Sequence, residues 1–227
     1  MNLNNEGDFI LMNKPLDWTS FDVVARVRRT LGVKKIGHAG TLDPKATGLL
    51  ILCTGKMTKS ITEFSDLQKE YIGTLELGAV TNSFDSETEV IERKDITGIN
   101  EIKIKEVFHS FIGIQKQLPP MFSAVKVNGR RLYKYARKGR TIERPEREIQ
   151  IAEFELLSFS PPYVEFRIQC SKGTYVRSIV HDVGQALRCG AYLTSLRRTK
   201  IGTYSIEKAL EVYRLEELSE QYSGEPA

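Results

Sequence analysis

Segments with helical and strand periodicity follow one another in no regular order along this chain of 227 residues, and that order most restricts the fold. Residues 163–170 alternate apolar and polar side chains, as a strand with one buried face does. Residues 100–113 repeat apolar side chains at helical spacing behind Asn100, a residue type that caps helix N-termini. We therefore predict an α+β fold with a mixed, mainly antiparallel central sheet flanked by helices.

A second helix is predicted over residues 19–31, where Thr19 and Ser20 are suited to cap its N-terminus. Its apolar residues recur at helical spacing and are expected to face the core: Phe21, Val24, Val27 and Leu31. By contrast, residues 81–95 are acidic and rich in turn-forming residues, so we expect a surface excursion there.

The chain contains no internal repeat and no low-complexity linker, which favours one domain spanning residues 1–227. Within it, prolines, an Asn-Gly turn signal and basic residues predict a thumb-like excursion at about 115–148. Residues 206–227 are expected to form an acidic helix and tail, whose apolar face would dock on the body.

Charge is distributed unevenly. The net charge is +4, yet residues 126–147, the basic segment, carry nine Lys and Arg side chains against two Glu, so the other 205 residues sum to −3. Clustered cations repel one another unless a polyanion neutralises them, so the basic segment is a candidate nucleic-acid surface. The alternative is a solvated basic loop.

Composition excludes several classes of protein. There is no apolar run of about 18 residues, and the first residues lack the basic and hydrophobic regions of a secretory signal, so a cytoplasmic protein is expected. Three cysteines with no close pair do not encode a disulfide framework and are expected to pack in the core. The three histidines lack metal-ligand spacing, so no metal site is predicted.

The stretch KKIGHAGTLDPKATGLLILCTG, residues 34–55, holds one carboxylate, Asp43, in a Gly-rich loop. A phosphate-binding loop is disfavoured because the predicted order is helix, loop, strand, and because a carboxylate would repel phosphate. Asp43 either forms an Asp-Pro turn or serves as a catalytic carboxylate, which would need a neighbouring cation to stay ionised. A helix is predicted to begin at Thr174, which places Arg177 in its first turn. Arg177 is a candidate cation, because the helix dipole does not favour a cation there.

Several motifs together identify a family. The stretch GHAGTLDPKATGLLILCTGKMTK closely resembles the signature loop of the TruB family of tRNA pseudouridine synthases. Further matches follow in order: NKPLDWTSFDVV, KEYIGTLELG, LPPMFSAVKVNGRRLYKYARKG, CSKGTYVRSIVHDVG and LTSLRRTKIG. Together they extend from about residue 10 to 202, so the resemblance covers most of the chain and implies the pseudouridine synthase fold.

The resemblance implies conversion of uridine 55 in the T-loop of tRNA to pseudouridine, without a cofactor. Asp43 matches the catalytic aspartate, which would act as a nucleophile at the ribose or the base, or as a proton acceptor from the sugar. Tyr71 matches the active-site tyrosine, and Arg177 matches the arginine that pairs with the aspartate. Substrate-binding roles are implied for a further set: His38, Leu196, Lys14, Lys126, Arg130, Arg131 and Lys134.

Without the resemblance, plainer interpretations hold. Tyr71 would be a strand aromatic in the core, Leu196 a core residue and His38 a loop hydrogen-bonder. The competing functional classes are a non-catalytic protein that binds or folds RNA, and a synthase that acts on another RNA site.

The predicted partner is the T-arm of tRNA, bound by a monomer, with no membrane association. The chain departs from many relatives in ending about 25 residues after RTKIG, without room for a full PUA domain. Either the sequence is truncated or the protein is a compact, stand-alone member of the family. We expect the latter, because EKALEVYRLEEL has an apolar face that could dock on the body, and we do not expect assembly with a guide RNA.

Overall fold

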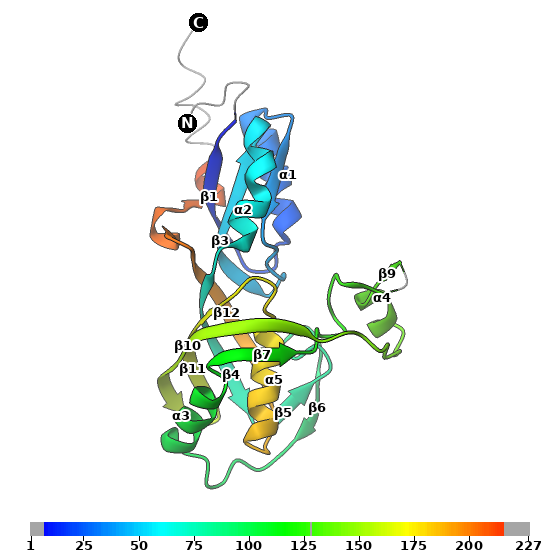
Figure 1. Ribbon diagram of the computed structural model, residues 1–227, viewed down its shortest axis with the longest axis vertical. Helices are drawn as coiled ribbons and strands as arrows, with labels where there is room; N and C mark the ends of the chain where they lie inside the picture. The colour runs from blue at the N-terminus through cyan, green and yellow to red at the C-terminus, as the bar shows by residue number, and fades with distance from the viewer. Residues whose placement is uncertain (1–6, 128, 216–227) are drawn as a thin grey trace, which may run out of the picture. The chain divides into compact units, whose positions relative to one another are not determined.

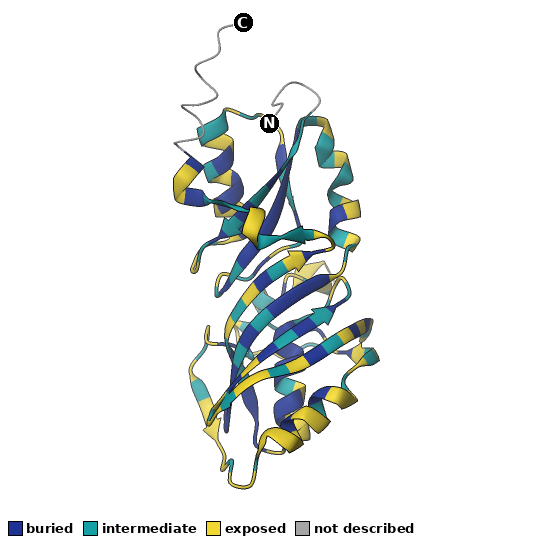
Figure 2. Ribbon diagram, turned by 90° about the vertical axis from the view of Figure 1, so that its left-hand side faces the viewer, coloured by how far each residue is buried: buried dark blue, intermediate teal, exposed yellow. Residues whose placement is uncertain are grey.

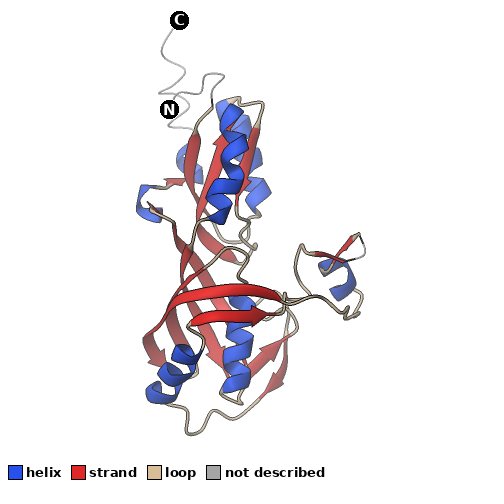
Figure 3. Cartoon of the chain, viewed as in Figure 1, coloured by secondary structure: helices blue, strands red, loops and turns tan. Residues whose placement is uncertain are grey.

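The computed structural model describes residues 7–127 and 129–215 (Figure 1). The chain divides into two compact units: residues up to Tyr71 together with those from Leu196 onward form the first, and Ile72–Ser195 form the second. The α+β class and the mixed central sheet are confirmed, with both parallel and antiparallel strand pairs (Figure 3). The single folding domain stays a prediction.

In the first unit, the sheet order is β14-β1-β3-β12, and β2 also pairs with β3. The strands are β1 (Phe9–Lys14), β2 (Ile36–Ala39), β3 (Ala46–Thr54), β12 (Ala191–Ile201, which begins in the second unit), β13 (Tyr204–Ser205) and β14 (Leu210–Glu211). β1 and β2 are antiparallel to β3, whereas β12 runs parallel to it. The helical elements are α1 (Ser20–Leu31), η1 (Gly55–Ser60), α2 (Ile61–Asp66), η2 (Ile206–Lys208) and η3 (Val212–Arg214).

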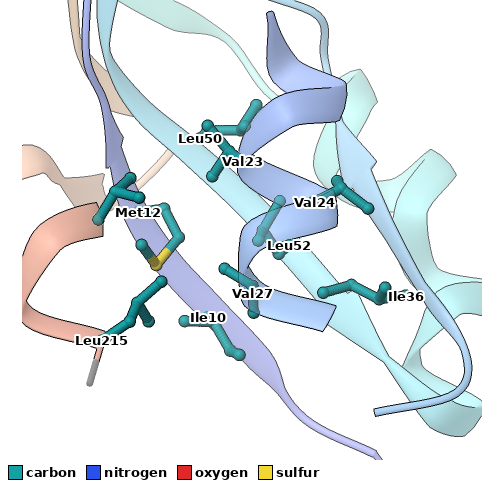
Figure 4. Close-up of a cluster of buried hydrophobic side chains, with 10 residues drawn as sticks. Ile10, Met12, Val23, Val24, Val27, Ile36, Leu50, Leu52 and Leu215 are labelled. Atoms are coloured by element: carbon teal, nitrogen blue, oxygen red, sulfur yellow. The ribbon is translucent and has the colours of Figure 1, made fainter. Parts of the chain in front are cut away.

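One core of this unit lies between α1 and the sheet (Figure 4). β1 supplies Ile10 and Met12, and β3 supplies Leu50 and Leu52, all almost fully buried. Helix α1 contributes Val23, Val24 and Val27, while Ile36, Val212 and Leu215 complete the cluster. Burying such a side chain stabilises the fold by about 1.5 to 3 kcal/mol, so this cluster fixes α1 and the loop that follows it on β1 and β3.

Helix α1 begins as predicted at Thr19, whose side chain accepts a hydrogen bond from the Asp22 N–H while Asp22 bonds back to Thr19. The predicted orientation of Phe21 is wrong, because 70% of that side chain is exposed. The helix instead turns its Val23 face inward.

The second unit contains the sheet order β4-β11-β10-β7. Its strands are β4 (Lys69–Leu77, which begins in the first unit), β7 (Gly113–Gln117), β10 (Arg147–Ser160) and β11 (Tyr163–Cys170). The alternation predicted for β11 is confirmed, since Val164, Phe166 and Ile168 are buried and their neighbours less so (Figure 2). Helices α3 (Glu101–Ser110, capped by Asn100) and α5 (Val176–Ala186) belong to this unit.

Residues 81–95 are only partly the predicted surface excursion. They contain most of the hairpin β5 (Ala79–Thr81) and β6 (Val90–Arg93), and the turn between these strands buries Ser83 and Asp85. Asp85 is held inward by an ion pair with Arg177, which a search for apolar periodicity cannot detect.

The C-terminal prediction needs a similar correction. From residue 206 to 214 the chain forms η2, β14 and η3 rather than a regular helix, because β14 pairs with β1. The predicted docking of its apolar side chains is confirmed by Val212 and Leu215, which join the core. The remainder of the predicted tail lies outside the described residues.

Within residues 7–127 and 129–215, no helix has both the length and the apolar character needed to span a membrane. All three cysteines are buried thiols, as the sequence predicts.

Candidate active site

The Asp43 loop, residues 40–45, connects β2 to β3 in the first unit. It turns tightly, since the Ala46 N–H donates to the Asp43 carbonyl at 3.0 Å. Ser20, buried in the first turn of α1, binds both backbone groups of Leu42: its hydroxyl accepts from the N–H at 3.0 Å and lies 3.3 Å from the carbonyl oxygen. The backbone on each side of Asp43 is therefore fixed, and an Asp-Pro turn is present as the sequence suggests.

Lys14 lies beneath this loop. Its side chain is fully buried, and its ammonium donates to the carbonyl oxygens of Pro15 (2.8 Å), Trp18 (2.6 Å) and Pro44 (3.3 Å). Burial lowers the pKa of Lys14 to about 8, an effect that the nearby Asp43 carboxylate opposes. The predicted RNA contact of Lys14 stays a prediction, and in this structure its ammonium is buried against three carbonyl oxygens.

A second buried cation, Arg198 on β12, supports the other end of the loop. Its guanidinium donates to the carbonyl oxygens of Leu49 (2.7 Å) and Gly40 (2.9 Å), and only 1% of the residue is exposed. Sequence reasoning did not single out Arg198, although it belongs to the SLRRTKIG motif. The sequence did contain a signal for this role. In a strand whose residues alternate between buried and exposed positions, an Arg at a buried position must find buried hydrogen-bond acceptors.

Leu196 lies close to the Asp43 turn because of strand pairing. On β12 it is the parallel partner of Ala46, the residue whose N–H closes the turn at Asp43. The neighbouring Thr47 hydroxyl lies 3.4 Å from the Leu196 carbonyl, which strengthens the pairing. Strand pairing thus places Leu196 opposite the residue that closes the Asp43 turn.

Tyr71 lies on β4, the neighbour of β12 in the sheet, and only 8% of it is exposed. The preceding residue, Glu70, accepts a hydrogen bond from the Thr199 hydroxyl at 2.8 Å and lies 3.2 Å from the Lys200 ammonium. These contacts hold the start of β4 against β12. A buried tyrosine is therefore positioned one strand from Leu196.

His38, on β2, is half-buried and its ring meets the ring of Phe21 edge to face, with centroids 5.3 Å apart. Burial, aided by the positive charge of Arg198, lowers the pKa of His38. Its imidazole is therefore neutral near pH 7 and can stack or accept a hydrogen bond.

Arg177 lies in the second unit, in the first turn of α5, and is buried. Its guanidinium Nε is 3.4 Å from an oxygen of Asp85, and its terminal nitrogens donate to the carbonyl oxygens of Ser83 and Phe122 at 3.0 Å each. Asp85 was missed by sequence reasoning, which placed it on the surface. An Arg held in this way has little freedom to reorient.

The basic segment also lies in the second unit, where it forms the hairpin of β8 (Lys126–Val127) and β9 (Arg130–Arg131) followed by α4 (Tyr133–Ala136). Leu132 is buried and anchors this small element. The four residues predicted to contact RNA are all exposed: Lys126, Arg130, Arg131 and Lys134. Exposed cations on a short, separately anchored element suit a nucleic-acid surface.

Among the described residues, no group of three or more His, Cys, Asp or Glu side chains is placed to hold a metal ion. The candidate site of the first unit contains the carboxylate of Asp43, a buried tyrosine and an apolar side chain, at a loop held by buried cations.

Similarity to solved structures defines the class. The fold is similar to that in "Crystal Structure of a Cbf5-Nop10-Gar1 Complex", with a TM-score of 0.77 and 29% identity, over 97% of this chain and 56% of that one. It is similar as well to "Crystal structure of the archaeal box H/ACA sRNP Nop10-Cbf5 complex", with a TM-score of 0.70 and 26% identity, again over 56% of that chain. The fold is that of the pseudouridine synthases.

Sequence comparison then defines the family. The profile described as "TruB family pseudouridylate synthase (N terminal domain)" matches residues 28–176, and "tRNA pseudouridylate synthase B C-terminal domain" matches residues 177–225. The "tRNA pseudouridine synthase B" of Chlorobaculum tepidum is 50% identical over 92% of this chain and 90% of its own length. That of Flavobacterium johnsoniae is 48% identical over 93% and 96%. The chain belongs to the TruB family.

Proposed function

We propose that this protein isomerises uridine 55 in the T-loop of tRNA to pseudouridine. One observation carries the proposal: Asp43 is fixed on a loop that Ser20, Lys14 and Arg198 hold from beneath, in a chain about half identical to curated tRNA pseudouridine synthases B. A turn-forming aspartate alone does not require two buried cations under its loop, since each costs desolvation energy.

The reaction breaks the bond between N1 of uracil and C1′ of the ribose and forms a bond between C5 and C1′. C5 loses a proton and N1 gains one, so atoms and electrons balance without an oxidant or reductant. Asp43 acts in this scheme either as a nucleophile at the ribose or the base, or as the acceptor of a sugar proton. Its fixed backbone supports any of these roles, because each needs a carboxylate in a defined position.

The target uridine must leave the RNA stack to reach Asp43, at a cost of a few kcal/mol. We assign Leu196 and Tyr71 to the pocket for the flipped base, and Tyr71 is also a candidate for handling the C5 proton. Support comes from the pairing of Leu196 with Ala46 and from the burial of Tyr71 on the neighbouring strand. His38, half-buried on β2, is assigned to the RNA loop around that base.

Arg177 is proposed to keep Asp43 ionised during the reaction, with Asp85 as the residue that orients the guanidinium. The support is the ion pair and the two carbonyl contacts of Arg177, which restrict its orientation. The pairing of Arg177 with Asp43 stays a prediction, and Arg177→Met tests it: the acidic limb of the single-turnover pH profile should move to higher pH.

The basic segment, with Lys126, Arg130, Arg131 and Lys134, is proposed to bind the phosphates of the T-arm. The exposure of these side chains supports this. We further propose that the protein acts in the cytoplasm as a monomer and without a guide RNA.

The experiment that tests the function compares Asp43→Asn with the parent. Asn keeps the size and the turn-forming hydrogen bond but loses the charge. The variant should fold, bind tRNA as the parent does, and release no tritium from tRNA labelled at uridine C5, because release requires the base to be detached and rejoined. Substantial release by a variant shown not to deamidate would contradict the role of Asp43.

A matched control is Asp17→Asn. Asp17 lies beside the same loop, with a 2.7 Å ion pair to Lys45, and its φ of 63° is a value that Asn tolerates well. Tritium release by this variant should match the parent. Mapping pseudouridines in RNA from a deletion strain then separates position 55 from other RNA sites, and no lost pseudouridine would favour a non-catalytic RNA-binding protein.

A further inference from the structure

Phe21 is an exposed aromatic residue of the first unit that lies close to the Asp43 loop. It occupies the second position of α1, yet 70% of its side chain is exposed while Ser20, Val23 and Val24 of the same helix are buried. A single exposed aromatic residue is common on protein surfaces. Phe21 differs because its ring is held in place by the edge-to-face contact with His38, at 5.3 Å and an interplanar angle of 87°.

The ring is also rigidly linked to the Asp43 loop. Its neighbour Ser20 makes the two close contacts with Leu42 described above, and Leu42 directly precedes Asp43. The capping box of Thr19 and Asp22 fixes the backbone around Phe21. The exposed ring thus occupies a defined place beside the loop, so a group that bound to it would be positioned relative to that loop.

Charge around the ring indicates what kind of group would bind. The last turn of α1 and the segment before β2 carry four exposed cations: Arg28, Arg29, Lys34 and Lys35. The carboxylate of Asp22, next to Phe21, is exposed as well, but it is bonded to Thr19 in the capping box. Along the helix, Arg28 lies about 10 Å from Phe21, at 1.5 Å per residue. The lowered pKa of His38 leaves its ring uncharged near pH 7. An exposed aromatic ring near exposed cations is the combination that binds single-stranded nucleic acid, because a base stacks on the ring and phosphates meet the cations.

We propose that the exposed face of Phe21 is a stacking platform for an unpaired base of the substrate RNA, next to the nucleotide that enters the site of Asp43. This inference rests on the proposed function. The flipped nucleotide leaves its neighbours unstacked, and a base–aromatic contact at Phe21 would offset part of that cost. Phe21 is then a positioning residue for the RNA, and it takes no part in bond making or breaking.

The test is a series of substitutions at position 21, measured as tRNA dissociation constants at several salt concentrations. Phe21→Ala should weaken binding by roughly 5- to 150-fold, the range found when an aromatic partner of one base is removed. Phe21→Tyr and Phe21→Trp should bind within about threefold of the parent, whereas Phe21→Leu, which is apolar without a π-face, should resemble Phe21→Ala. The salt dependence of binding should not change, because stacking releases no counterions.

Tyr213→Ala is the matched control. Tyr213 is an aromatic residue of the same unit and is 74% exposed, so its removal tests whether loss of any surface ring weakens binding. It should bind tRNA as the parent does. Position 21 is exposed and helical, so Ala and Leu should leave the unfolding midpoint almost unchanged; if Phe21→Ala unfolds, Phe21→Leu carries the comparison.

If both Phe21→Ala and Phe21→Leu bind tRNA with the affinity of the parent, the inference is overturned. It is also overturned if Phe21→Leu alone does so, because apolar packing rather than stacking would then explain the effect of Phe21. Failure of the proposed function is distinguishable, because it would appear in the parent protein as absent tritium release from C5-labelled tRNA, whatever the affinities of the Phe21 variants.

Discussion

Two buried cations under one loop are an unusual arrangement at the level of single residues. The donors of Lys14 and Arg198 are directed at main-chain carbonyl oxygens. Carbonyl acceptors satisfy the donors without neutralising the charge, so the positive potential remains available to a nearby carboxylate. In agreement with this attraction, the Asp43 carboxylate raises the pKa of Lys14 against the effect of burial.

Replacing Lys14 by Met, which has similar length and no charge, should lower the free energy of unfolding by about 2 to 3 kcal/mol at pH 7, since buried carbonyls lose their donor. The effect should depend on pH. The folded pKa of about 8 lies below the value of 10.5 for an unperturbed lysine. Between these values the unfolded parent binds more protons than the folded parent, so the stability of the parent rises with pH relative to the variant.

Urea unfolding of the two proteins at pH 7, 8, 9 and 10 checks this prediction. The difference in free energy of unfolding between the parent and Lys14→Met should be constant below pH 8 and increase above it. Lys45→Met is the control, because Lys45 forms an exposed ion pair with Asp17 and should contribute less than about 1 kcal/mol, with no such widening. If this difference for Lys14→Met is the same at all four pH values, burial does not lower the pKa of Lys14.

At the scale of elements, the close approach of β3 and β12 depends on a glycine. Gly48 has a φ of +105°, and a Cβ at this position would lie 2.3 Å from the carbonyl oxygen of Arg198, its partner in the parallel register. No side chain fits there without separating the strands. The same pairing brings Leu196 opposite Ala46, so this glycine also sets the distance between β12 and the Asp43 turn.

Gly48→Ala should therefore destabilise the protein by about 3 kcal/mol or more, through backbone strain and the clash together. Gly32→Ala separates the two effects. Gly32 ends α1 with a φ of +63° and has nothing within 4 Å of a Cβ, so only strain applies, at about 1 to 2 kcal/mol. Urea denaturation of both variants measures the difference, and equal losses would show that the strands can separate at low cost.

Predictions from sequence succeeded where one local signal determined the element. The Thr19 cap and the alternation in β11 are examples, because capping and burial act within a few residues. Strand β2 was not predicted, since its residues IGHA carry no apolar alternation and become a strand only by pairing with β3. Phe21 was misplaced because helical spacing fits more than one face of α1, and packing against β1 and β3 selects one.

The candidate site shows the same division. The motifs named Asp43, Tyr71 and Leu196 as candidates, and their roles stay predictions. Their spatial relation follows from strand order, which the sequence alone does not specify. The burial of Lys14 and Asp85 could not be predicted, because charged residues are normally exposed and only tertiary partners make their burial tolerable.

At the scale of the whole molecule, the excess positive charge lies in the basic segment, while the rest of the chain is slightly acidic. Neutralising Arg130, Arg131 and Lys134 should weaken tRNA binding and reduce its dependence on salt. Each lost phosphate contact should lower the slope of log affinity against log salt by roughly 0.7 to 0.9.

Binding measured between low and moderate salt tests this, with a triple variant of equal charge change as the control: Lys94→Gln, Lys103→Gln and Lys105→Gln. These three lysines are exposed in the second unit, outside the basic segment. The control should shift the slope much less, and equal shifts would indicate that net charge alone, rather than the basic segment, attracts the RNA.

The full burial of Lys14 makes this residue a potential chemical reporter on motion. An amine with a pKa of about 8 would be among the most nucleophilic lysines toward an acylating reagent at that pH, yet no reagent reaches it while the ammonium stays under the Pro44 carbonyl. The acetylation rate of Lys14, divided by that of the partly exposed Lys45 in the Asp43 loop, measures how often the Asp43 loop opens. Mass spectrometry of the two lysines would then give the rate at which the Asp43 loop opens. RNA bound over this loop would slow the labelling of Lys14.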